Sequence, residues 1–119
     1  MITLEELKKD RALINSIDWD MTPELAVRVY LEWGNIWSRG EERRYVTRST
    51  SEYSTYFVVN CWDKPYYIYL LKRNQKEVIE LAKFALPERF EKSVCLLRGM
   101  YAPEGELKEW LEEELGVRH

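Results

Sequence analysis

The stretch that most constrains this fold covers residues 53–73, which hold the densest set of β-branched and aromatic residues in the chain. Such residues are enriched in strands because their stiff, bulky side chains pack well on a pleated surface. Asp-Lys-Pro at 63–65 interrupts the stretch, and Pro favours a turn because it fixes φ and cannot donate to a central ladder. The stretch therefore predicts a β-hairpin with strands at 54–62 and 66–73.

A third strand is predicted just before this hairpin. Residues 43–48 alternate weakly, and the charged side chains among them are typical of an edge strand, where they discourage pairing with other molecules. Together with the hairpin they predict a three-stranded antiparallel meander of 43–48, 54–62 and 66–73.

Helix signals precede the predicted sheet. Residues 3–6, Thr-Leu-Glu-Glu, have the form of a capping box, and they predict a peripheral helix that extends through residue 17. Thr-Pro-Glu at 22–24 opens a second helix with a hydroxyl cap, a proline at the first position and an acid near the positive end of the dipole. Apolar residues cover most of this helix over 22–33, so we expect it to be the central helix, packed on the sheet.

Further helix signals follow the hairpin. Asn-Gln-Lys-Glu at 74–77 repeats the capping pattern and predicts a helix that ends before Pro87. Pro87 can open another helix, although a strand over 94–97 is a competing interpretation, because short apolar runs are ambiguous. A last helix is predicted between Pro103 and Gly116.

These elements predict one α+β domain over residues 1–119. A small antiparallel sheet of about three strands, with the hairpin 54–62/66–73 at its centre, would be packed by four to five helices. A chain of 119 residues is long enough to bury a hydrophobic core, and its apolar fraction of 45% is that of a globular protein.

Charge and composition restrict the partners. The net charge is −3, which disfavours nucleic acid and anionic membranes as partners. No segment approaches the roughly 18 consecutive apolar residues of a membrane span, and the N-terminus has no apolar signal-peptide core. Cys61 and Cys95 lack CxxC spacing and are expected to be free, buried thiols, although the sequence also permits a disulfide between them. We therefore expect a cytoplasmic protein.

Few residues offer catalytic chemistry. The sole histidine is the last residue, His119, which leaves no Ser–His or Cys–His nucleophile pair and no imidazole metal site. A carboxylate-based small-molecule or metal site near Asp18, Asp20 and Glu24 is conceivable, but Asp20 and Glu24 equally suit the N-terminus of the predicted second helix. A non-enzymatic protein with no catalytic residue, metal or cofactor is the favoured interpretation.

The hairpin carries the main functional hypothesis. Apolar side chains lie on both faces of its strands, so either helices cover both faces or one face is an exposed tyrosine-rich platform. Tyr, Trp and Arg are enriched at interface hot spots, which favours an interaction or accessory module that binds another protein or itself. The alternative is single-stranded nucleic acid stacked on the same platform. The candidate contact residues are Arg44, Arg48, Tyr67, Tyr69 and Arg73.

Five short sequence motifs of this chain together resemble those of a known protein family. They are Asp-Trp-Asp-Met-Thr-Pro-Glu at 18–24, Tyr-Leu-Glu-Trp-Gly-Asn at 30–35, Tyr-Phe-Val-Val-Asn-Cys-Trp at 56–62, Arg-Asn at 73–74 and Trp-Leu at 110–111. Over nearly the whole chain, these phrases resemble a family of small uncharacterised proteins from sulfate- and metal-reducing anaerobic bacteria. The resemblance implies a bacterial cytosolic setting and adds no catalytic residue, cofactor or substrate.

Overall fold

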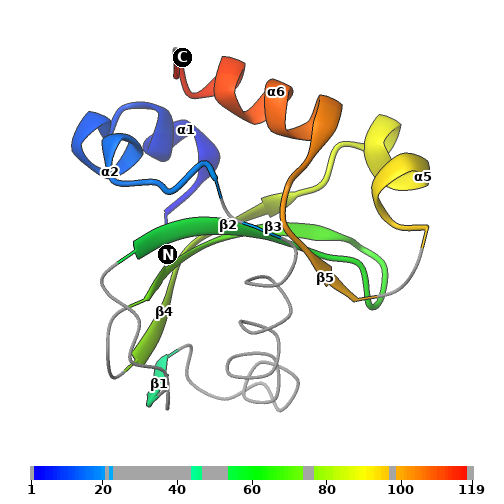
Figure 1. The fold of residues 1–119 in the computed structure, drawn as a ribbon, viewed down its shortest axis with the longest axis horizontal. Helices are drawn as coiled ribbons and strands as arrows, with labels where there is room; N and C mark the ends of the chain where they lie inside the picture. Colours follow the sequence, from blue (N-terminus) through cyan, green and yellow to red (C-terminus); the bar gives the residue numbers. More distant parts are fainter. Residues whose placement is uncertain are drawn as a thin grey trace.

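The computed structural model describes residues 2–20, 22, 44–46, 54–73, 77–96 and 99–117. These residues form an α+β fold, as predicted (Figure 1). The elements in chain order are α1 (Leu4–Lys8), α2 (Arg11–Asn15), β1 (Arg44–Val46), β2 (Ser54–Asn60), β3 (Tyr67–Arg73), β4 (Glu77–Ala85), the 3₁₀ helix η2 (Glu88–Phe90), α5 (Glu91–Val94), β5 (Met100–Tyr101) and α6 (Gly105–Glu114).

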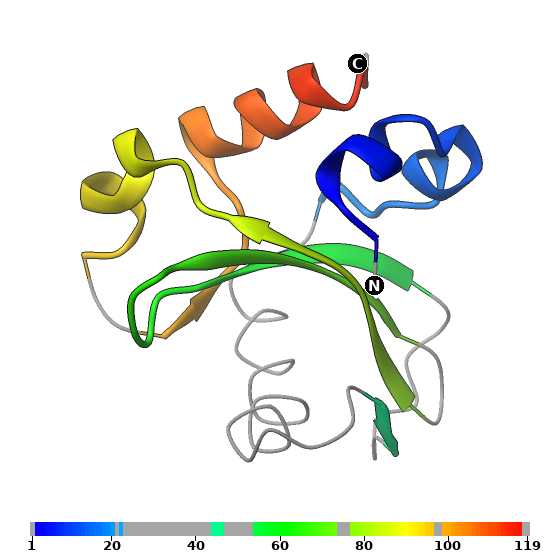
Figure 2. The ribbon, with the colours of Figure 1, turned by 180° about the vertical axis from the view of Figure 1, so that it is seen from behind.

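The strands form one curved antiparallel sheet in the order β1-β4-β3-β2-β5. The predicted hairpin is confirmed, because β2 and β3 pair along their whole length, from Ser54 opposite Arg73 to Asn60 opposite Tyr67. Figures 1 and 2 show that α1, α2, α5 and α6 all lie on one face of this sheet. The described sheet has five strands, two more than predicted.

The predicted helix before Pro87 is wrong, because its residues form strand β4. Leu70 pairs with Ala82 and Leu71 pairs with Glu80, so a β-bulge leaves Leu81 without a partner on β3. The bulge puts the apolar residues Ile79 and Ala82 on the same face of the strand although they are three positions apart. Three positions is also the spacing of neighbours on a helix, so this apolar pair fits a helix as well as a bulged strand.

The predicted meander is also wrong in its order. Strand β1 pairs with β4, through Arg44 opposite Ile79, and not with β2. Alternation along a strand determines which side chains share a face, but it does not determine which strand becomes the neighbour. Strand β5 has only two residues, which is too short for any alternation to be visible in the sequence.

The N-terminal segment crosses the sheet and contacts β4 and β2, the two strands that flank the central strand β3. Ile2 forms a parallel bridge with Ala82 of β4, and Ile17 forms one with Thr55 of β2. Leu7 and Ile14 lie between these two contacts, and both are fully buried. The predicted capping box at Thr3 is present, but the segment is not peripheral, since it covers one face of the sheet.

The segment also divides into two helices, where one was predicted. Lys9 is the C-cap of the first helix, and Asp10 is the N-cap of the second, where its carboxylate accepts a hydrogen bond from the Leu13 backbone N–H at 3.0 Å. A side-chain cap of this kind lets a new helix start within two residues of the previous one.

The hydrophobic core lies between the helices and the sheet. Sheet residues such as Phe57, Ile68 and Leu70 pack there against Leu107 and Leu111 of α6. The opposite face of the sheet is buried as well, at Tyr56, Val58, Tyr69 and Leu71. The sheet is thus buried on both faces at its centre.

The C-terminal part follows its local signals. Residues 91–94 are helical, which decides between the helix and the strand that the sequence left open, and α6 forms in the predicted region. Gly116 has φ +66° just after α6, a conformation that favours glycine and marks a helix end. The predicted central helix over 22–33 lies outside the described residues, apart from Thr22.

None of the helices in the described ranges has the length and hydropathy that a membrane span requires.

Candidate functional site

The connection of the β2–β3 hairpin lies beside α5 and β5 at one end of the sheet (Figures 1 and 2). Here the Lys64 ammonium group is 3.6 Å from the Glu91 carboxylate, which places the hairpin turn next to the start of α5. The same ammonium group lies 5.8 Å from the centre of the Tyr66 ring. We call this region the hairpin-tip surface and define it as Trp62, Lys64, Pro65, Tyr66 and Leu96.

The local sequence explains the shape of the hairpin connection. Asn60 is buried at the end of β2, and its side-chain oxygen accepts a hydrogen bond from the Trp62 backbone N–H at 3.0 Å. An Asn that bonds to the backbone two residues ahead makes a turn without help from the ladder. This bond holds the chain around Trp62 where it leaves the sheet.

Cys61 and Cys95 form a disulfide, so the prediction of two free thiols is wrong. Cys61 follows the last residue of β2, and Cys95 is the C-cap of α5, with 5.6 Å between their Cα atoms. This distance is usual for bonded cysteines. The two residues are 34 positions apart, and the tertiary fold brings them together.

Two large apolar side chains are exposed among the described residues, and each directly follows one of these cysteines. Trp62 is 36% exposed and Leu96 is 80% exposed. Single exposed apolar residues are common on protein surfaces and need no explanation. A pair attached to the two ends of one disulfide is different, because the covalent bond keeps both on the same part of the surface.

The tyrosines predicted as contacts have different environments. Tyr69 is fully buried on the sheet face opposite α1, α2, α5 and α6, so its ring is not accessible to a partner. Tyr67 is partly buried near the hairpin tip, and the Lys83 ammonium group lies 4.1 Å from the centre of its ring. This cation–π contact already occupies one face of the Tyr67 ring.

The predicted arginines are not gathered with these tyrosines. Arg73 pairs with Ser54 at the end of the hairpin away from Tyr67, and Arg44 belongs to β1, which pairs with the beginning of β4. A seven-residue strand spans about 20 Å, so Tyr67 and Arg73 lie at opposite ends of β3. Arg48 lies outside the described residues.

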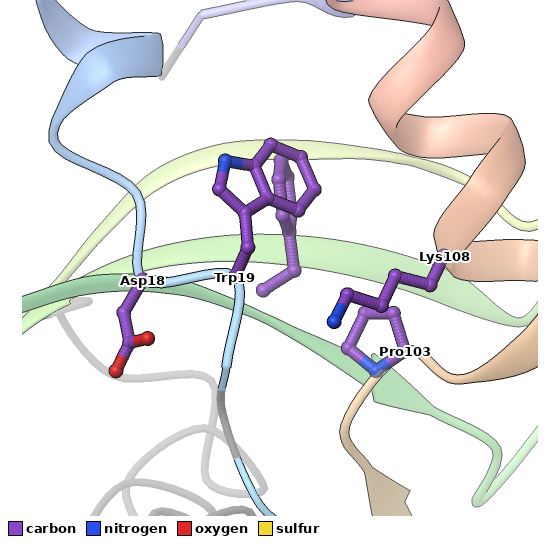
Figure 3. A pocket seen from close by; sticks show the side chains of 5 residues that line it. Asp18, Trp19, Pro103 and Lys108 are labelled. Carbon is purple, nitrogen blue, oxygen red and sulfur yellow. The ribbon is translucent and has the colours of Figure 1, made fainter. Parts of the chain in front are cut away.

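Among the residues that the structure describes, no second group converges on Asp18 as the carboxylate hypothesis requires. Asp18 and Asp20 are both exposed, and an Asp18 carboxylate oxygen accepts a hydrogen bond from the Asp20 backbone N–H at 2.9 Å, as in a local turn. Figure 3 shows the Asp18 carboxylate pointing away from the Trp19 ring. Within the described ranges no cluster of three or more His, Cys, Asp and Glu residues could hold a metal ion, and Glu24 lies outside those ranges.

The hollow in Figure 3 is too small for a substrate. Its walls come from Trp19, Phe57, Pro103 and Lys108, together with Asp18, and it has room for about one water molecule. The Trp19 and Phe57 rings in its wall contact each other, with their centroids 5.7 Å apart. The hollow is a gap in packing at the edge of β2 and offers no binding site of useful size.

The pKa values of Tyr101 and Lys8 are shifted, and both residues lie outside the hairpin-tip surface. Burial raises the pKa of the Tyr101 hydroxyl. Hydrogen bonds to Glu114 and then to Glu5 raise the pKa of Lys8, whose ammonium group is 2.9 Å from the Glu114 carboxylate. Both groups are moved upward from values that are already basic, so neither shift prepares an acid or base for catalysis near neutral pH.

Arg11 lines an open groove between α2 and the turn after α6. Its guanidinium group donates to the Leu115 carbonyl at 2.6 Å and to the Gly116 carbonyl at 3.3 Å. The first carbonyl belongs to Leu115, the C-cap of α6, which lacks an intrahelical partner, and the second belongs to the residue after it. Arg11 therefore caps α6 and ties it to α2.

The loss of this cap gives a first testable prediction. We expect Arg11→Ala to lower the free energy of unfolding by about 1 kcal/mol, because two carbonyl acceptors lose a charged donor. Urea unfolding measures the difference. Arg11→Lys is the matched control, since it keeps the charge but loses the two-pronged donor, and it should recover only part of the loss. An unchanged midpoint in Arg11→Ala would show that the cap contributes nothing.

A comparison with known proteins found no matching family model, no similar curated protein and no similar solved structure.

Proposed function

We propose that this chain is a non-enzymatic protein-interaction module that binds its partner through the hairpin-tip surface. The observation that carries the proposal is the exposure of Trp62 and Leu96 on the two sides of one disulfide. Tryptophan is the residue type most typical of interface hot spots, and an exposed leucine next to it extends the apolar area.

The surroundings of the two residues support a preformed contact. The disulfide and the hydrogen bond from Trp62 to Asn60 hold the backbone on both sides. A surface that is ordered before binding loses less conformational entropy when the partner arrives. Charged side chains of both signs, at Asp63 and Lys64, border the apolar pair, as the polar rim borders the centre of an interface.

The partner that fits is a protein presenting an apolar side chain between Trp62 and Leu96. Two side chains bury far less than the roughly 800 Å² per partner of a standard stable complex, so the contact is a transient one or includes further residues around the tip. Binding of a second copy of the chain is one case of this proposal. A cytoplasmic location is part of the proposal.

The other two hypotheses have less support. Stacking of nucleic acid on the hairpin would need accessible tyrosine rings, and Tyr69 is buried. A carboxylate site would need a convergent second group, and the Asp18 carboxylate bonds instead to the backbone of Asp20.

The proposal predicts the loss of binding in a double variant, Trp62→Ser with Leu96→Ser. The tagged wild type is first used to recover proteins from its own host lysate, with and without nuclease, and the recovered protein is then purified and titrated. We expect one partner in both samples and an affinity at least about tenfold weaker for the double variant, because two anchor side chains are removed.

The matched control is Lys9→Ser with Glu109→Ser, which changes two exposed residues away from the hairpin tip and should bind as the wild type does. Sedimentation of the purified chain at increasing concentration tests self-association with the same variants. A partner that the tip variant retains would contradict the proposal. Partners that disappear with nuclease would favour nucleic acid instead.

A further inference from the structure

We propose that the Cys61–Cys95 disulfide is a thiol–disulfide exchange site through which a dithiol reductant switches off binding at the hairpin-tip surface. The inference rests on the proposed function, since it assigns the regulation of the same surface. It depends on three features of the site: the different burial of the two cysteines, the position of Trp62 and Leu96, and the shortness of α5, whose ion pair to the hairpin is exposed.

The two cysteines differ in accessibility. Cys61 is fully buried, and its backbone N–H donates to the Gly99 carbonyl at 2.8 Å. Cys95 is partly exposed at the C-terminal end of α5. Because Cys61 has no exposed surface, the proposal assigns attack by a reductant to the Cys95 side of the bond.

The dithiol supplies the two electrons and two protons that the exchange reaction requires. One thiolate of the reductant attacks the Cys95 sulfur and forms a mixed disulfide, while the electron pair of the broken bond goes to the Cys61 sulfur, which takes up a proton. The second thiolate of the reductant then attacks the sulfur that the first one contributed, and Cys95 leaves as a thiol. The chain gains two electrons and two protons, and the dithiol is oxidised to a disulfide.

Opening the bond separates the two apolar contacts. Trp62 belongs to the hairpin and Leu96 follows α5, so the disulfide between their neighbours is the covalent link that keeps them together. Among the described residues, the Lys64–Glu91 ion pair also joins these two segments, and the Lys64 side chain is 70% exposed. An ion pair so exposed to water contributes little, and the four-residue α5 is too short to be a stable helix by itself.

The change is expected to stay local. Phe90, just before α5, is buried, and its ring centroid is 5.9 Å from that of Trp110 in α6. This contact does not depend on the disulfide, so it anchors the beginning of α5 in both redox states. Leu96 moves with the end of α5, while Trp62 stays on the hairpin.

In a reducing compartment, a disulfide of this kind is expected to open and close and can therefore regulate binding. Disulfides of cytosolic proteins are mostly transient and take part in catalysis or redox sensing, whereas permanent structural ones belong to oxidising compartments. The proposed cytoplasmic location and the observed disulfide are therefore consistent with each other if the bond opens and closes.

The test uses the full chain in its oxidised form and after treatment with dithiothreitol. Alkylation followed by mass spectrometry measures the opening of the bond, and hydrogen exchange measures its effect. We expect dithiothreitol to expose both thiols in the folded protein. The Cys61 amide and the amides of residues 99–101 should then exchange at least about tenfold faster, because the local opening becomes easier, whereas β3 should be unchanged.

The controls separate redox chemistry from folding. The double variant Cys61→Ala with Cys95→Ala should show the fast exchange without reductant and no response to dithiothreitol. If this variant does not fold, the oxidised and reduced wild type still complete the comparison. A disulfide that dithiothreitol leaves closed in the folded chain, or an opening that leaves exchange at Cys61 unchanged, would overturn the proposal.

Partner binding distinguishes the switch from the proposed function. With the recovered partner, the reduced chain should bind about tenfold more weakly than the oxidised chain. Equal affinities in both redox states would overturn the switch and leave the interaction module standing. An oxidised chain that binds no partner would overturn the interaction module, and the alkylation and exchange results would then support the exchange site alone.

Discussion

Replacing Phe57 by alanine is expected to lower the free energy of unfolding by about 3–5 kcal/mol. Phe57 is buried in the middle of β2, and its side chain faces the helices. Its ring centroid is 5.7 Å from that of Trp19 and 6.0 Å from that of Phe84, so one side chain joins the N-terminal segment to two strands of the sheet. Removal of the ring loses its burial and leaves a cavity that these neighbours cannot fill without moving.

Urea unfolding followed by circular dichroism measures this difference. Leu96→Ala is the matched control, because it also removes a large apolar side chain but one that is 80% exposed, and it should change the free energy of unfolding by no more than about 0.5 kcal/mol. Similar losses in the two variants would show that Phe57 is not part of a packed core.

The double variant Cys61→Ala with Cys95→Ala is expected to lose about 3–4 kcal/mol. The disulfide closes a loop between residues 34 positions apart, and closing a loop of this length removes conformational entropy from the unfolded chain by about this amount in the chain-entropy description. Alanine is used in place of serine because Cys61 is buried, where a hydroxyl group without a partner would add its own cost.

Dithiothreitol provides the internal control for this prediction. The reduced wild type should be destabilised by a similar amount, and the double variant should not respond to the reductant. An oxidised and a reduced wild type with the same unfolding midpoint would show that the disulfide contributes nothing to stability.

The two expected losses have different consequences for function. Domains of this size are typically stable by about 5–15 kcal/mol, so a chain that loses its disulfide can still be folded. A folded, reduced chain with a loosened α5 is the state that the proposed switch requires. Loss of Phe57 instead weakens the packing between the helices and the sheet and should affect binding only through the fraction of folded protein.

The sequence alone determined the elements whose signals are local. The hairpin followed from a dense β-forming run with Asp-Lys-Pro in the middle, and the first helix from the Thr3 capping box. The end of α6 followed from Gly116, which has the positive φ that a helix end favours. In each case the interacting groups are a few residues apart, so their order in the chain already specifies the geometry.

The tertiary structure decided everything that depends on distant partners. The bulge at Leu81 forms where β4 meets β3, and it accommodates the three-residue spacing of Ile79 and Ala82, which the sequence alone could not distinguish from that of a helix. Strand β1 pairs with β4, and Cys61 is bonded to Cys95, which is 34 positions away in the sequence. Pairing and packing over such separations depend on the complete arrangement of the chain and leave no pattern within a short window.

The candidate surface shows the same division. The sequence predicted that aromatic residues of the hairpin are important, but only the fold determined that Tyr69 is buried and Trp62 exposed. Leu96 gave no signal by itself, and the repeated pattern of a cysteine followed by a large apolar residue, at 61–62 and 95–96, was the one clue available. Burial is a property of all neighbours of a side chain, and most of those neighbours come from elsewhere in the chain.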